Sequence, residues 1–168
     1  TTEDFSSDGE TATIKVKVKN TGAVSGKETV QVYFSAPQKG TGSAKLSKAA
    51  KELCAFEKTK LLPPGAEQTL TLTFAINDMA QYDDTGAAGH KSAYILEAGE
   101  YGIFVGNSIK DAGTRRAGTI VIDEVKVIEQ LTEQCSTNLN ERLTADGTYE
   151  SLHQSTPESI LLEAGGTL

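Results

Sequence analysis

The chain has 168 residues, which is enough for one domain with a hydrophobic core and a tail. Its net charge is −7, and no cluster of Lys and Arg with interleaved aromatic residues occurs, which argues against nucleic-acid binding. No apolar run approaches the roughly 18 residues that a membrane-spanning helix needs, which argues against a membrane partner.

The chain begins at Thr1 rather than at an initiator Met, so we expect a processed protein or a segment of a longer one. A segment of this kind would have lost any signal peptide. Cytoplasmic and secreted locations therefore both stay open.

A period of two dominates the first 130 residues and predicts β-strands. The clearest cases are residues 11–19, with an apolar face from Ala12 to Val18, and residues 68–76, with an apolar face from Leu70 to Ile76. Further strands are expected at 27–35, 52–60, 94–96, 100–105 and 119–128. Turn residues such as Pro63-Pro64-Gly65 separate them.

Some segments depart from simple alternation. Residues 52–60 carry a continuous apolar run, which indicates a strand buried on both faces or a bulge. The pattern shifts its phase at Asp123-Glu124, which indicates a bulge or two abutting strands. Residues 77–82 are typical of one short helical turn that Asn77 or Asp78 can cap, and a polar loop is expected at 83–91.

Six or seven short strands with Gly and Pro turns predict an all-β, two-sheet sandwich over residues 1–130. Residues 131–168 are acidic, polar and poor in periodicity, so we expect a linker or an extended arm toward a following domain. Within this arm, Asp146-Gly147 is a candidate hairpin turn between Leu143 and Tyr149.

Residues that could carry chemistry are scattered. Cys54 and Cys135 favour two free thiols over a disulfide, and together with His90 and His153 they lack the spacing of a zinc site. A calcium site at Asp78, Asp83 and Asp84 is a weaker alternative to a solvated loop. We expect Asp83-Asp84 to be a turn former rather than a catalytic pair, and we assign no catalytic, cofactor-binding or metal-binding residue.

Four aromatic residues are candidates for contact with a neighbouring domain or with a sugar: Tyr33, Tyr82, Tyr94 and Phe104. Tyr33 and Phe104 fall on the faces opposite the core residues of their strands. Packing under loops or against a neighbouring domain is favoured over sugar binding, because the chain has no Trp to act as a platform. The lysine-rich loop 39–51 is expected to be solvated, or to reach toward an active-site rim.

Several short segments, in this order and spacing, resemble a known module. They include Asn20-Thr21-Gly22, Ser35-Ala36-Pro37, Asp78-Met79-Ala80, Gly99-Glu100-Tyr101 and Val105-Gly106-Asn107-Ser108. The resemblance is to the fibronectin type III-like domain of glycoside hydrolase family 3, the β-glucosidase family, and covers about residues 11–111. It implies an immunoglobulin/fibronectin type III-like sandwich.

The resemblance also implies a role. In the family, the nucleophile and the acid/base come from other domains, so this module is expected to be a non-catalytic part that packs against a catalytic barrel and an α/β sandwich domain. The arm, with Glu141-Arg142-Leu143, resembles the connector of members with reversed domain order. A carbohydrate-binding module and a stand-alone adhesion or spacer domain are the alternatives. Domain packing further predicts an exposed apolar patch on one face of the sandwich.

Overall fold

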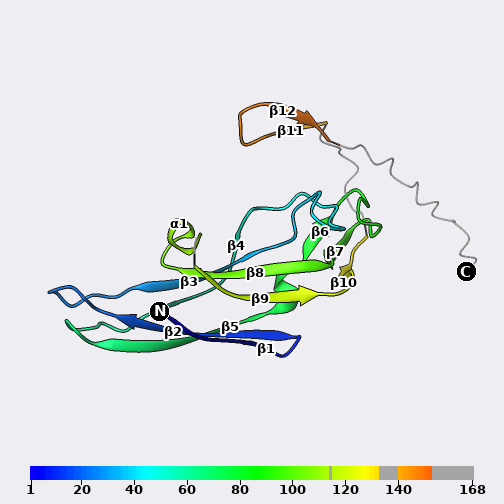
Figure 1. Cartoon of the computed structure of the whole chain (residues 1–168). Helices are drawn as coiled ribbons and strands as arrows, with labels where there is room; N and C mark the ends of the chain where they lie inside the picture. The colour runs from blue at the N-terminus through cyan, green and yellow to red at the C-terminus, as the bar shows by residue number, and fades with distance from the viewer. Residues whose placement is uncertain (114, 133–139, 153–168) are drawn as a thin grey trace, which may run out of the picture. The chain divides into compact units, whose positions relative to one another are not determined.

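A computed structural model describes residues 1–113, 115–132 and 140–152 (Figure 1). The chain forms two compact units, residues 1–130 and 131–168, which are described separately. None of the helices among the described residues is long and apolar enough to cross a membrane.

The first sheet of the larger unit has the order β1-β2-β5. It contains β1 (Thr2–Ser7), β2 (Thr11–Lys19) and β5 (Glu67–Ala75). In β2 and β5 every second residue is buried, as the alternating sequence predicts, and the antiparallel register places Ile14 opposite Leu72 and Val16 opposite Leu70. One face of this sheet is therefore apolar and buried, and the other is polar and exposed to solvent.

The second sheet has the order β4-β3-β8-β9. It contains β3 (Thr29–Ser35), β4 (Glu52–Lys58), β8 (Gly99–Gly106) and β9 (Arg116–Ile122). Figure 1 shows this sheet lying over β2 and β5. The all-β two-sheet sandwich predicted from the sequence is confirmed.

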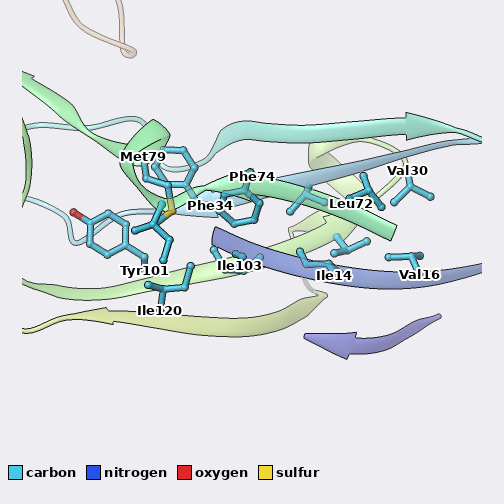
Figure 2. Close-up of a cluster of buried hydrophobic side chains, with 14 of the residues drawn as sticks. Ile14, Val16, Val30, Phe34, Leu72, Phe74, Met79, Tyr101, Ile103 and Ile120 are labelled. Atoms are coloured by element: carbon cyan, nitrogen blue, oxygen red, sulfur yellow. The ribbon is translucent and has the colours of Figure 1, made fainter. Parts of the chain in front are cut away.

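The core fills the space between the two sheets (Figure 2). Ile14 and Leu72 come from the first sheet, and Phe34, Tyr101 and Ile103 come from the second. Tyr101 is fully buried, and its hydroxyl donates to the backbone carbonyl of Glu97 at 3.0 Å, so its polar atom is satisfied.

A third, small sheet has the order β10-β7-β6. It contains β6 (Gln81–Asp83), β7 (Ala93–Leu96) and β10 (Lys126–Gln130). Ala93 and Ile95 of β7 are buried against Leu46 in a second apolar cluster, which is separate from the main core. This sheet and the loop that contains Leu46 thus form a second packed region.

The structure corrects several sequence-based expectations. The segment 119–128 belongs to two strands, β9 and β10, in different sheets, so the two-strand alternative is correct. Asn77 and Asp78 do not cap the short helix η1 (Ile76–Met79): the residue before it is Ala75, with no side-chain cap. Strands β1 and β6 and the one-turn helix α1 (Ile109–Ala112) were not expected.

The described part of the smaller unit is a hairpin of β11 (Glu141–Leu143) and β12 (Tyr149–Ser151). The predicted turn at Asp146-Gly147 is confirmed, and Gly147 has the positive φ of +83° that favours glycine. Hydrogen bonds from Thr144 and Thr148 lower the pKa of Asp146 to about 2.

Candidate functional site

The outer face of the sheet β4-β3-β8-β9 carries a row of apolar side chains. Val32 and Phe34 belong to the core, so Tyr33 between them lies on the outer face. The register places Tyr33 directly opposite Leu53 on β4 and opposite Phe104 on β8. Three neighbouring strands therefore contribute one continuous row.

A bulge adds a second exposed residue from β4. The register between β3 and β4 shifts at Val32/Tyr33, and both Cys54 and Ala55 pack against the core. In a regular strand, residues three apart point to opposite faces, but the bulge turns both Leu53 and Phe56 outward. The bulged alternative for 52–60 is correct, and burial on both faces is wrong.

We call Tyr33, Leu53, Phe56 and Phe104 the outer-sheet patch. Phe56 is 70% exposed and Leu53 is 50% exposed, whereas Tyr33 is only 8% exposed and Phe104 is half-buried. The Tyr33 hydroxyl donates to the side-chain carbonyl of Gln31, which lies opposite Phe56. The patch thus has a packed centre and two protruding members on the edge strand.

The Phe104 ring packs against Gly102 and lies close to Lys51. A Cβ added at Gly102 would lie 2.9 Å from the Cε2 atom of Phe104, so the ring lies over the bare backbone of this glycine. The Nζ atom of Lys51 lies 4.4 Å from the ring centroid, at cation–π distance. Arg116 is the strand partner of Phe104 on β9 and donates to Thr119 at 2.6 Å. The patch therefore has an apolar centre and a charged rim, the usual arrangement of protein interfaces.

Tyr82 and Tyr94 form a separate aromatic pair on the third sheet. They are direct partners on β6 and β7, with ring centroids 5.2 Å apart and an interplanar angle of 50°. Tyr82 is 41% exposed and Tyr94 is 40% exposed. The four aromatic candidates are thus divided between two surfaces, Tyr33 and Phe104 on one and Tyr82 and Tyr94 on the other.

A buried ion pair holds the loop 38–50 in place. Glu97 accepts hydrogen bonds from the backbone N–H groups of Lys45 at 2.7 Å and Leu46 at 3.2 Å, and it pairs with the ammonium group of Lys48. The same ammonium group donates to the carbonyl of Pro37 at 2.7 Å. Sequence reasoning missed Glu97, because no local pattern marks the partner of a buried charge.

Asp83 is fully buried, so the expected solvent exposure is wrong, although this residue does shape a turn of the chain. Its Oδ2 atom accepts from the backbone N–H groups of Ala88 at 3.0 Å and His90 at 3.1 Å, which organises the loop after β6. Asp78 and Asp84 are exposed. No group of three or more His, Cys, Asp or Glu side chains that could hold a metal ion occurs among the described residues, so the calcium alternative gains no support.

Cys54 carries a free thiol whose pKa is raised to about 12, chiefly because burial disfavours the thiolate. A thiol with so high a pKa is a poor nucleophile and a poor metal ligand. Cys135 and His153 lie outside the described residues.

Comparison with known proteins places the sandwich in a family. Residues 28–109 match the model of the fibronectin type III-like domain. The chain is 43% identical over 156 residues to a β-glucosidase of Ruminococcus albus, covering 92% of this chain and 16% of that protein. It is 44% identical over 144 residues to β-glucosidase A of Butyrivibrio fibrisolvens, covering 84% of this chain and 16% of that protein.

Solved structures with a similar fold are also β-glucosidases. A β-glucosidase from Paenibacillus barengoltzii matches with a TM-score of 0.72 and 38% identity over 94% of this chain and 18% of that chain. β-Glucosidase 3B from Thermotoga neapolitana matches with a TM-score of 0.60 and 32% identity over 75% of this chain and 16% of that chain. The chain thus spans about one sixth of the length of each of these four proteins.

Proposed function

Because this chain carries the fibronectin type III-like domain of family 3 β-glucosidases, we propose that it is a non-catalytic structural module of a larger glycoside hydrolase. In this proposal it packs against the catalytic barrel and the α/β sandwich domain and positions them. In the same proposal residues 131–168 connect the sandwich to a following domain, and residues 133–139 and 153–168 of this connection lie outside the described part of the chain. The observation that carries the proposal is the alignment of 92% of this chain with only 16% of a β-glucosidase.

The test compares p-nitrophenyl β-glucoside hydrolysis by this 168-residue chain with hydrolysis by the full-length protein that contains it. We expect turnover by the full-length protein and none by the chain alone. Hydrolysis by the chain itself would overturn the proposal. A coding sequence that ends at Leu168 would also overturn it and would favour a stand-alone adhesion or spacer domain.

The exposed pair Tyr82–Tyr94 favours a second candidate, a carbohydrate-binding module, because apolar sugar faces stack on exposed aromatic rings. Its rings are tilted by 50°, which is poorly suited to a flat platform. Calorimetric titration of the chain with cello-oligosaccharides and with xylan decides this candidate. Heat that the Tyr82→Ala variant abolishes would support it, and no heat would eliminate it.

A further inference from the structure

We propose that the outer-sheet patch is the surface through which this module docks onto another domain of the same polypeptide. The inference rests on the proposed function and adds to it which face of the sandwich is covered. The occupant is an apolar surface of another domain, in contact with Phe56 and Leu53.

The first support is the exposure of large apolar side chains that are contiguous. Single apolar residues on a surface are normal, whereas a contiguous apolar patch marks an interaction site. Phe56 and Leu53 are 70% and 50% exposed, and Leu53 lies directly across from Tyr33, which in turn faces Phe104. The four side chains form one surface rather than scattered contacts.

The second support is the bulge in β4. Edge strands usually protect themselves with charged side chains on the exposed face. Here the bulge keeps Cys54 and Ala55 on the core and turns two large apolar residues outward from an edge strand. A strand that faced only water would gain nothing from this arrangement.

The third support is the shape of the face. Gly102 and Gly106 place no side chain on it, and the Phe104 ring lies over Gly102. A Cβ at Gly106 would lie 2.4 Å from the backbone nitrogen of Ala112, so α1 packs on this glycine and borders the face at one end. Figure 1 shows α1 on the side of β3 and β8 that faces away from β2 and β5. The side chains of this face that are open to a partner are Phe56 and Leu53 of β4.

The lengths of the relatives favour a partner surface in the same polypeptide. The matched region is 16% of the Ruminococcus albus β-glucosidase, so most of such a polypeptide lies outside the module and is tethered to it. Tethering raises the effective concentration of the partner surface, so a small apolar patch suffices for stable docking. The Tyr82–Tyr94 pair lies on a different sheet. Its solvent protection can therefore be compared with that of Phe56 and Leu53.

Hydroxyl-radical footprinting with mass spectrometry tests the proposal. The oxidation rates of Phe56, Leu53, Tyr82 and Tyr94 are measured in the 168-residue chain and in the full-length protein. We expect Phe56 and Leu53 to be protected several-fold in the full-length protein. If they oxidise equally in both while other residues of the module are protected, the docking face is wrong and the proposed function stands. If no residue of the module is protected, both fail.

A matched pair of variants separates docking from folding. Phe56→Asp alters the patch, and Val24→Asp alters a residue that is 79% exposed in the β2–β3 loop. We expect Phe56→Asp to lower the Tm of the full-length protein and Val24→Asp to leave it unchanged, while neither changes the Tm of the isolated chain. If Phe56→Asp lowered the Tm of the isolated chain as much as that of the full-length protein, the side chain would only stabilise the module. That result would overturn the proposal.

Discussion

The ammonium group of Lys48 and the carboxylate of Glu97 form an ion pair that water does not reach. The two side chains are 0% and 2% exposed, and 49 residues separate them in the sequence. Burying two charges is costly unless further hydrogen bonds satisfy them. Here the carbonyl of Pro37 and two backbone N–H groups of the loop supply those bonds, so the pair ties the loop 38–50 to the end of β7.

The Lys48→Met variant tests this connection. It keeps an apolar stem and removes the ammonium group, which leaves a buried carboxylate without its counter-charge. We expect the free energy of unfolding in urea to fall by about 3–5 kcal/mol. The control is Lys19→Met, which breaks the exposed pair with Glu67 and is expected to cost about 0–1 kcal/mol. Equal losses in the two variants would contradict a structural role for the buried pair.

A second buried carboxylate, Asp83, organises the loop after β6. The Asp83→Ala variant leaves the N–H groups of Ala88 and His90 without their acceptor, so we expect a loss of about 1–3 kcal/mol. Amide hydrogen exchange is expected to show faster exchange at these two positions. Asp84→Ala is the control, because Asp84 is exposed, and it is expected to change the stability by no more than about 0.5 kcal/mol. Unchanged exchange at Ala88 in Asp83→Ala would refute the assignment.

Alkaline pH is expected to destabilise the sandwich. Burial raises the pKa of Cys54 from its ordinary value of 9.0 to about 12, and burial likewise raises the pKa of Tyr101 from 10.0 to about 12. Between the ordinary pKa and the raised pKa of each group, the unfolded chain has released a proton that the native protein still holds. Rising pH therefore favours unfolding in this range. The stability that these groups contribute is complete below about pH 9 and is lost toward pH 12.

Thermal unfolding as a function of pH measures this effect. In the Cys54→Ala variant, the decline of Tm between neutral and alkaline pH is expected to be shallower than in the parent chain, whatever the Tm at neutral pH. The Tyr101→Phe variant is likewise expected to show a shallower decline of Tm at alkaline pH than the parent chain. Identical slopes in all three proteins would show that neither group controls the alkaline transition.

Strand β1 is anchored to β9 through a close contact between Phe5 and Gly118. A Cβ added at Gly118 would lie 2.2 Å from the Cδ1 atom of Phe5, a distance that real atoms do not adopt. We expect Gly118→Ala to cost about 1–3 kcal/mol and to loosen β1. The Phe5→Ala/Gly118→Ala double variant is expected to lose less than the sum of the single losses. Additive losses in chemical denaturation would contradict the contact.

The sequence alone predicts most of the strand layout, because burial in a pleated strand is a local property. The alternation in β2 and β5 names their core residues correctly, and Asp146-Gly147 identifies the hairpin turn. The ordered short segments point to the fibronectin type III-like domain that the family model matches. Strand β1 was missed because its apolar content is a single ring, Phe5.

The tertiary structure alone decides the features on which the candidate site depends. The exposure of Phe56 and Leu53 follows from a bulge, and a bulge is set by the register between two strands rather than by either strand's own pattern. The burial of Asp83 and the pairing of Glu97 with Lys48 depend on partners several to 49 residues away. A charged residue is expected to be solvated when only its own sequence neighbourhood is considered. The distant chain segments that bury it are brought there by the tertiary structure.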